Sequence, residues 1–281
     1  MNALVVGAGP VGKFVAQILQ AQNLEVQTLV RGGTLKEVGA NSSIWLCVKG
    51  YDVESVLQGI RNHLNPSHDL FLISNGLGIY DRAVSICPTL KFYRLLLNFG
   101  VSLDKQGRVS QHGEARVLLA GAAHLQLEVS NWTEELGRYG FLVELCESVK
   151  HCEWRKLMVN LLVNTLATLA NAPNKILIED PGVHQRALHL LQEIRNVARA
   201  QGINLDSWSN DYIFQSIKDH GENFNSTLCD LRNGKRTELP FMLDAFIERA
   251  QIAGIESPLA SALKQQLDLL MRGTPSLQDL V

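Results

Sequence analysis

Residues 3–31 read "ALVVGAGPVGKFVAQILQAQNLEVQTLVR", and this stretch decides the fold class. The apolar run 3–7 predicts a strand, the amphipathic run 11–23 a helix, and 25–31 a second strand. The alternation continues along the chain, with a strand, a helix and a strand predicted at 43–49, 53–64 and 69–76. Strands that alternate with helices favour a parallel sheet covered by helices on both faces.

The second half of the chain has a different, helical pattern. Between about 92 and 145 we expect further short strands and one short helix. After about residue 150 the periodicity predicts helices at 153–171, 182–201, 207–232, 237–253 and 257–271. We therefore predict a shortened Rossmann domain of the α/β class over residues 1–148, followed by an all-α domain over residues 149–281.

Three glycines lie between the first strand and the first helix. Gly7 would permit a tight turn, Gly9 would let the backbone approach a pyrophosphate, and Gly12 would let helix and strand pack closely. With Pro10 and Val11 between them, they predict a dinucleotide site at the N-terminus of the helix. The alternative is a glycine-rich turn that binds nothing.

The end of the second predicted strand bears on the choice of cofactor. NAD sites usually carry an acidic residue there, but this chain has "TLVRGG", with Arg31 and no acid. A guanidinium suits a 2′-phosphate, so we predict NADP(H). The alternative is that Arg31 is a solvated surface charge.

Composition and charge exclude several classes of partner. The formal net charge of the 281 residues is −2, which favours neither nucleic acid nor an anionic membrane surface. The five cysteines show no paired spacing and are expected as reduced thiols of a cytoplasmic protein. We expect no membrane span, because no apolar run is long enough, and no metal, because no His, Cys or Asp cluster has ligand spacing.

A polar stripe crosses the apolar stretch 153–173, "EWRKLMVNLLVNTLATLANAP". At helical spacing Lys156, Asn160, Asn164 and Asn171 lie within an arc of about 80°. Such groups are costly to bury unless they form a closed network or line a wet pocket. A partly desolvated lysine there could protonate a developing alkoxide, and the amides could bind substrate oxygens. The alternative is a core helix with a snorkelling lysine.

Several segments of the sequence resemble those of a known protein family. "WRKLMVNLLVNTLATLANAP" (154–173), "STLCDLRNGKRTEL" (226–239) and "AGIESP" (253–258) resemble segments of the ketopantoate reductases, also called 2-dehydropantoate 2-reductases. "GAGPVG", "VRGG", "CVKGYDV" and "SNGLG" follow the family's N-terminal pattern in order. The resemblance implies a 6-phosphogluconate-dehydrogenase-like architecture of two domains, with the active site in the cleft between them. It also implies NADPH-dependent reduction of ketopantoate to pantoate, for the synthesis of pantothenate and coenzyme A.

The resemblance implies roles for individual residues. Lys156 aligns with the general acid that protonates the substrate carbonyl, and Glu238 with the carboxylate that helps place it. The substrate-binding positions are Asn160, Asn164 and Ser226. The cofactor positions are Gly7, Gly9, Pro10, Val11, Gly12, Arg31, Lys49 and Asn75. Without the resemblance, Glu238 and Ser226 read as exposed polar groups and Lys49 as a surface charge.

The chain departs from the family at three places. The segment between Arg31 and Lys49 is shorter than usual and lacks room for an extra strand pair, so a reduced sheet edge is expected. Leu239 and Pro240 follow Glu238 where the family usually has an apolar residue and then an acid. Ala245 replaces a family glycine. Pro240 should reshape the start of the helix that follows it.

Two other functions remain open. One is the reduction of a different branched 2-oxo acid by the same groups. The other is a non-catalytic NADP-binding regulatory protein, although such a protein has no need of a proton donor. The expected partner is a small 2-oxo acid, and the expected assembly is a monomer or homodimer.

Overall fold

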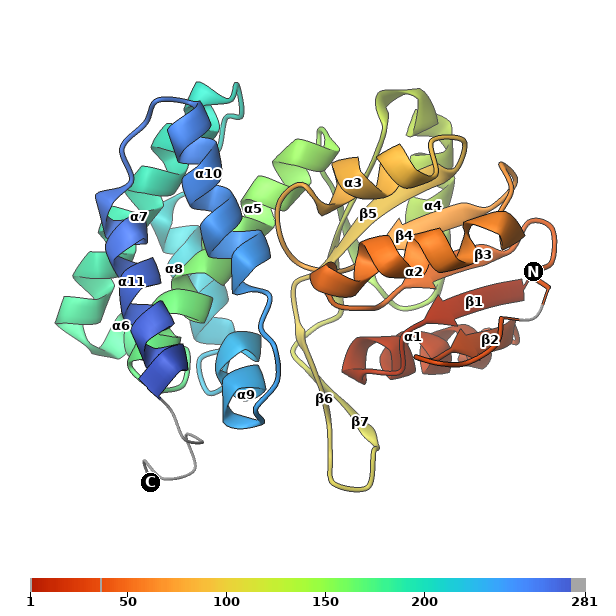
Figure 1. Cartoon of the computed structure of the whole chain (residues 1–281), viewed down its shortest axis with the longest axis horizontal. Coiled ribbons are helices and arrows are strands. Elements are labelled where there is room, and N and C mark those ends of the chain that lie inside the picture. The colour runs from red at the N-terminus through yellow and green to blue at the C-terminus, as the bar shows by residue number, and fades with distance from the viewer. Residues whose placement is uncertain (1, 36, 274–281) are drawn as a thin grey trace. The chain divides into compact units, whose positions relative to one another are not determined.

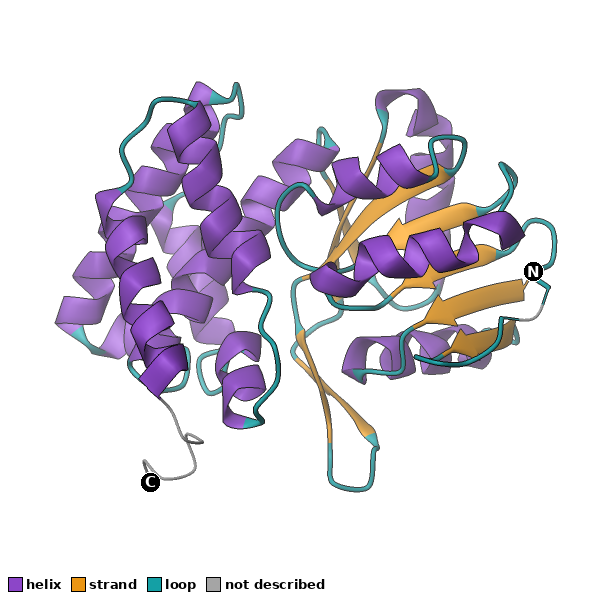
Figure 2. Cartoon of the chain, viewed as in Figure 1, coloured by secondary structure: helices purple, strands orange, loops and turns teal. Residues whose placement is uncertain are grey.

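The computed structural model describes residues 2–35 and 37–273. These residues form two compact units, one ending at Cys152 and the other beginning at Glu153. Every strand of the described residues belongs to the first unit, and the second is built of helices (Figures 1 and 2). The predicted order of an α/β region followed by an all-α region is confirmed.

A seven-stranded sheet, in the order β2-β1-β3-β4-β5-β8-β9, forms the centre of the first unit. Its strands are β1 (Asn2–Val6), β2 (Glu25–Leu29), β3 (Ser43–Leu46), β4 (Asp69–Leu72), β5 (Lys91–Leu97), β8 (Arg116–Gly121) and β9 (Leu142–Leu145). Only the pairing of β5 with β8 is antiparallel among these neighbours. The apolar runs of β1, β3 and β4 are buried, as expected of parallel strands covered on both faces.

Helices cover both faces of this sheet, with α2 and α3 on one face and α1 and α4 on the other (Figure 1). They are α1 (Pro10–Ala21), α2 (Val53–Ile60), α3 (Ile79–Ile86) and α4 (Gln126–Arg138), with 3-10 turns η1 (Gly50–Asp52), η2 (Arg61–His63) and η3 (Ala123–Leu125). Aromatic rings fill the core beneath α1 and α4. Trp45 stacks on Phe71 at 4.4 Å, and Trp132 meets Phe71 edge to face at 4.7 Å.

A separate hairpin, β6 (Gly100–Leu103) and β7 (Val109–His112), contacts α1. Phe99 at its base packs against Phe14 of α1, with ring centroids 5.3 Å apart. The strand pairings at β5 and β6 were not predicted individually, and neither was α3. Strand β5 lacks an uninterrupted apolar run, because Lys91 and Arg94 are charged.

The connection from β2 to β3 is short and leaves β2 at the edge of the sheet, which confirms the expected reduced edge. Its described residues form no strand or helix. Side chains fix it instead: Ser42 Oγ donates to the Gly39 carbonyl at 2.7 Å. The buried His68 accepts from Asn65 N–H through Nδ1 at 3.1 Å, so its Nε2 donates to Gly39 O at 3.0 Å.

In the second unit, α7 contacts α6, α10, α11 and η4. The helices are α5 (Val149–Leu162), η4 (Val163–Ala167), α6 (Ile176–Glu179), α7 (Pro181–Ala200), α8 (Asn210–Asp219), α9 (Ser226–Arg232), η5 (Pro240–Asp244), α10 (Ala245–Ile252) and α11 (Pro258–Gly273). Of these, η4 and η5 are π-helical. Side chains of Asp180, Ser209 and Asn225 accept backbone N–H groups at the starts of α7, α8 and α9.

Two helix predictions for this unit were wrong in detail. The single helix expected over 207–232 is two helices, because Ser209 and Asn225 each begin a new one. The helix expected from 237 begins later and with a wide π turn at Pro240. Pro240 occupies the first turn of this segment, where the missing N–H of a proline costs no helical hydrogen bond.

Candidate active site

One edge of the sheet gathers the predicted cofactor residues of the first unit. Strands β2, β1, β3 and β4 run parallel and in register, with Val6 paired to Leu29 and Leu46, and Leu46 paired to Leu72. Their carboxyl ends therefore lie on the same edge. The residues that follow these ends are Arg31, the glycine loop, Lys49 and Asn75. The order in which the strands are added reverses between β1 and β3, and open α/β sheets bind their ligands at such a switch point.

The glycine loop has the geometry that its sequence predicts. Gly7 has φ +109°, and a Cβ there would lie 2.9 Å from the Cys47 carbonyl oxygen. A Cβ on Gly12 would lie 1.9 Å from the Gly7 carbonyl oxygen, so only glycine fits. At Gly9, by contrast, no atom lies within 4 Å of the Cβ position. Two glycines are therefore required by the chain's own packing, and the third faces open space.

The N-terminus of α1 follows this open space. Pro10 occupies its first turn, no side chain caps it, and its first turn carries no acidic residue. The N–H groups at the start of a helix lack partners within the helix, so those of Val11 and Gly12 can bind an anion. The loop and helix therefore fit a pyrophosphate, with the backbone of Gly9 at closest approach.

Arg31 is held by an acid that the sequence analysis missed. Its Nη2 lies 2.9 Å from both carboxylate oxygens of Asp52, at the end of η1. The Arg31 side chain is 84% exposed and that of Asp52 28%. The end of β2 carries no acid, because this acid comes from the turn after β3.

A fully buried arginine fixes the turn that carries Asn75. Arg94 of β5 donates to the carbonyl oxygens of Leu72 at 2.8 Å, Ser74 at 2.6 Å and Gly76 at 3.2 Å. These acceptors bracket Asn75, which is half-buried. Arg94 was also missed, although a charged residue within the apolar run "KFYRLLL" was a usable signal.

The Lys/Asn helix begins in α5 and continues through the π turn η4. Lys156 is half-buried, whereas Asn160 and Asn164 are 9% and 3% exposed. Asn164 Nδ2 donates to the Asn160 carbonyl at 2.9 Å. Its Oδ1 accepts from Thr227 N–H at 3.1 Å and from Ser226 Oγ at 3.3 Å. The structure thus brings Asn160, Asn164 and Ser226 together.

Asn171 does not belong to this stripe, contrary to the sequence prediction. It is exposed, has φ +48° and ends the helix in the left-handed conformation. Arg232 donates to its Oδ1 at 2.8 Å. The π turn at 163–167 also shifts the helix phase, so a uniform angle per residue fails beyond Asn164.

Glu238 is buried, with 5% of its surface exposed, just before the π turn η5. Its carbonyl accepts from Phe241 N–H at 2.9 Å. Met242 of the same turn places its Sδ 3.9 Å from Asn164 Nδ2. Asn164 therefore contacts both the start of α9 and the turn that follows Glu238. Lys156 and Glu238 both lie in the second unit.

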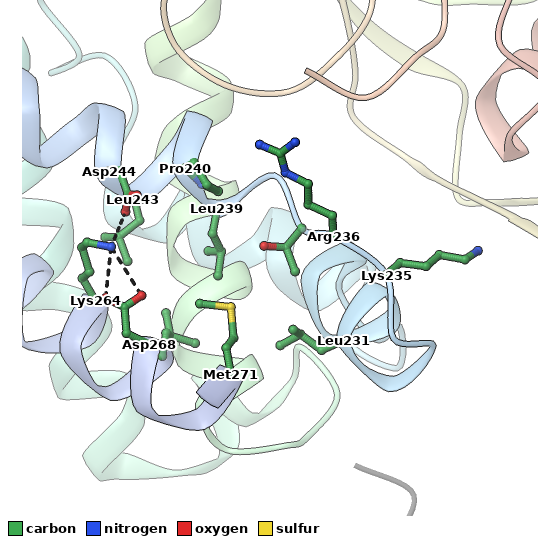
Figure 3. A pocket seen from close by; sticks show the side chains of 12 residues that line it. Leu231, Lys235, Arg236, Leu239, Pro240, Leu243, Asp244, Lys264, Asp268 and Met271 are labelled. Atoms are coloured by element: carbon green, nitrogen blue, oxygen red, sulfur yellow. Dashed lines mark hydrogen bonds and ion pairs between the residues drawn. The ribbon is translucent and has the colours of Figure 1, made fainter. Parts of the chain in front are cut away.

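A pocket of about 280 Å³ is lined in part by residues that precede and follow Glu238 in the sequence (Figure 3). Thr237, Leu239 and Pro240 contribute to its wall. Lys264 in this wall lies 3.1 Å from Asp244 and 3.2 Å from Asp268. Burial lowers the pKa of Lys264, but the two carboxylates outweigh it and hold the pKa above its ordinary value. None of the predicted substrate residues lines this pocket, so it is not the predicted substrate site.

Residues 2–35 and 37–273 contain no group of three His, Cys, Asp or Glu side chains placed to hold a metal ion. Nor does any helix in these ranges combine the length and the apolar character needed to cross a membrane.

Comparison with known proteins identifies two family regions. Residues 36–123 match the model "Ketopantoate reductase PanE/ApbA", and residues 148–270 match "Ketopantoate reductase PanE/ApbA C terminal". A 2-dehydropantoate 2-reductase of Pyrobaculum aerophilum is 26% identical over 83% of this chain and 77% of its own length.

Solved structures share the fold over nearly the whole chain. A PanE/ApbA family ketopantoate reductase from Ralstonia eutropha JMP134 has a TM-score of 0.83 at 21% identity, covering 97% of this chain and 99% of its own. A D-mandelate dehydrogenase solved with NADH and anilino(oxo)acetate has a TM-score of 0.88 at 18% identity, with the same coverage.

Proposed function

The chain belongs to the ketopantoate reductase family, and from this premise we propose that it reduces 2-dehydropantoate to pantoate with NADPH. This reaction serves the synthesis of pantothenate and coenzyme A. Within the proposal, the region 1–148 binds NADP(H) and the region 149–281 carries the substrate and proton-donor groups.

The single observation that carries the proposal is the buried amide network of the Lys/Asn helix. Asn164 joins the backbone carbonyl of Asn160 to the Ser226 hydroxyl through hydrogen bonds of 2.9 and 3.3 Å, and both asparagines are buried. Burying amides costs free energy unless they are bonded, so polar groups here need a structural or a binding role that offsets the cost. The half-buried Lys156 lies one helical turn before Asn160, on the same face.

The proposed chemistry assigns each group a task. Bound NADPH supplies a hydride to the C2 carbonyl carbon, and negative charge grows on the carbonyl oxygen. Lys156 stabilises that charge as an ammonium and then gives its proton to the oxygen. Glu238 orients the ammonium, while Asn160 and Ser226 bind the substrate's oxygens. Asn164 accepts a hydrogen bond from Ser226. It is also predicted to bind substrate, which would then bond to an Asn164 atom that now bonds to a protein group.

The proposed cofactor contacts lie along the carboxyl edge of the sheet. The open space at Gly9 and the uncapped start of α1 fit the pyrophosphate, with Gly7, Pro10, Val11 and Gly12 shaping the turn. Arg31 is proposed to bind the 2′-phosphate. Lys49 and Asn75 follow β3 and β4 on the same edge and complete the proposed set.

A second candidate is the reduction of a different branched 2-oxo acid. The π turn that starts at Pro240, two residues after the buried Glu238, favours it, because the family usually has an acid in place of this proline. A non-catalytic NADP-binding role is the remaining alternative. We place the protein in the cytoplasm as a monomer or homodimer, and its five free cysteines support that compartment.

Loss of NADPH absorbance with purified protein and 2-dehydropantoate tests the proposal. Saturable turnover that falls at least about 100-fold in Lys156→Ala supports both the reaction and the proton donor. Lys150→Ala is the matched control, because Lys150 is an exposed lysine on the same helix and should leave the rate unchanged. Tight NADPH binding without turnover would reject 2-dehydropantoate, and a panel of branched 2-oxo acids would then separate the two alternatives.

A further inference from the structure

We propose that Asp52 sets the balance between NADPH and NADH by competing with the cofactor's 2′-phosphate for Arg31. The inference rests on the proposed nicotinamide cofactor and adds a residue that governs its selection. Its basis is the ion pair in which Arg31 Nη2 lies 2.9 Å from Oδ1 and 2.9 Å from Oδ2 of Asp52.

The acid is the fixed partner of this pair and the arginine the movable one. Asp52 N–H donates to the Lys49 carbonyl at 2.8 Å, and the Asp52 carbonyl accepts from Ser55 Oγ at 3.0 Å. Its backbone is thus held at both ends of the turn between β3 and α2. Arg31 is 84% exposed on a long side chain, so it can turn toward a ligand while Asp52 stays in place.

A 2′-phosphate must therefore either share the Arg31 guanidinium with the Asp52 carboxylate or displace that carboxylate from it. The phosphate brings a charge close to −2 within a few ångströms of Asp52, and like charges at that range repel. NADH brings a neutral 2′-hydroxyl instead, which can donate a hydrogen bond to a carboxylate. Asp52 consequently disfavours NADPH and favours NADH, although Arg31 acts in the opposite direction.

Arg31 and Asp52 together determine which cofactor this edge of the sheet prefers. NAD sites usually place their acid at the end of the second strand, where this chain has Arg31. Here the acid comes from the turn after β3, on the other side of β1, and reaches the same guanidinium. The expected result is a protein that binds both cofactors, with a preference smaller than Arg31 alone would give.

Fluorescence titration of NADPH and NADH against the full chain tests the inference. Asp52→Asn should tighten NADPH by about threefold to tenfold and weaken NADH or leave it unchanged, so the ratio of the two dissociation constants shifts toward NADPH. Asp52 makes no side-chain cap bond to α2, so asparagine should preserve the fold. Glu54→Gln is the matched control, since it removes one exposed carboxylate two residues away and should leave the ratio unchanged.

Arg31→Gln tests the pair from its exposed side. It should weaken NADPH more than NADH, and Asp52→Asn should shift the ratio less in that background than in the wild-type chain, because the competition for Arg31 is gone. An unchanged ratio in Asp52→Asn, or an equal shift in Glu54→Gln, would overturn the role of Asp52 while leaving the proposed function standing. A wild-type chain that binds neither cofactor would overturn both.

Discussion

Asn164 anchors the start of α9, because its Oδ1 accepts the Thr227 N–H at 3.1 Å. Thr168, one turn later, donates to Asn225 Oδ1 at 3.0 Å, and Asn225 itself caps α9. Two polar side chains of one buried helix thus hold the segment that carries Ser226. The polar stripe read from the sequence is in part a positioning device for a neighbouring helix.

Replacing Asn164 by alanine should therefore destabilise the fold as well as impair the reaction. Asn164 is 3% exposed, and its loss leaves a buried N–H without an acceptor and a small void. We expect a loss of about 2–4 kcal/mol in the free energy of unfolding. Urea denaturation measures it, with Asn196→Ala on the exposed face of α7 as the control within about 0.5 kcal/mol. Equal stability of the two variants would contradict the anchoring role.

Arg94 should stabilise the turn that carries Asn75, although the two residues lie far apart in the sequence. Arg94→Met keeps the length of the side chain but removes the donors to Leu72, Ser74 and Gly76. Two buried carbonyl oxygens and one partly buried one would lose those bonds, and we expect a destabilisation of about 2–4 kcal/mol. Arg94→Lys restores the charge without the planar fork and should recover only part of the stability. A wild-type melting curve for Arg94→Lys would show that charge alone suffices.

The three glycines of the loop should respond differently to alanine. Gly12→Ala forces a Cβ to 1.9 Å from the Gly7 carbonyl and should prevent correct folding of the first unit. Gly9→Ala meets no atom within 4 Å and should fold normally, yet weaken cofactor binding by filling the approach to the backbone.

Circular dichroism and cofactor titration separate these two outcomes. Gly59→Ala, at an exposed position of α2 with no neighbour within 4 Å, is the control and should stabilise the chain by about 0.4–1 kcal/mol. If Gly9→Ala folded and still bound the cofactor with wild-type affinity, the pyrophosphate would not bind in the open space at Gly9.

The cysteines should react with alkylating reagents in an order set by burial. Burial raises the pKa of the Cys87 thiol more than the nearby Arg61 lowers it, so less thiolate is present at a given pH. Cys229 is exposed. Mass spectrometry after brief iodoacetamide treatment at pH 8 should find Cys229 modified well before Cys87, and a denatured sample should lose this difference. Equal labelling in the native protein would indicate that the first unit opens readily.

The strand, glycine loop and helix at the start of the chain were predictable because each follows from local spacing. Gly7 and Gly12 needed no tertiary knowledge, since a dinucleotide turn leaves no room for a side chain there. The same holds for Asn160 and Asn164, whose burial follows from the apolar residues around them.

Asp52 and Arg94 could not be predicted in their roles, because their partners come from other strands. Arg31 meets Asp52 only because β2 and β3 flank β1. Arg94 meets the Asn75 turn only because β5 pairs with β4. The error at Asn171 has a local cause, since asparagine readily adopts the left-handed conformation that ends a helix.

The short link between β2 and β3 also has a consequence for local opening. β2 is an edge strand that is mostly half-buried or exposed, whereas β4 is nearly wholly buried between β3 and β5. Amide hydrogens should therefore exchange sooner in β2 than in β4. The strand that leads to Arg31 thus opens more readily than the centre of the sheet, and a bound nucleotide should slow amide exchange there.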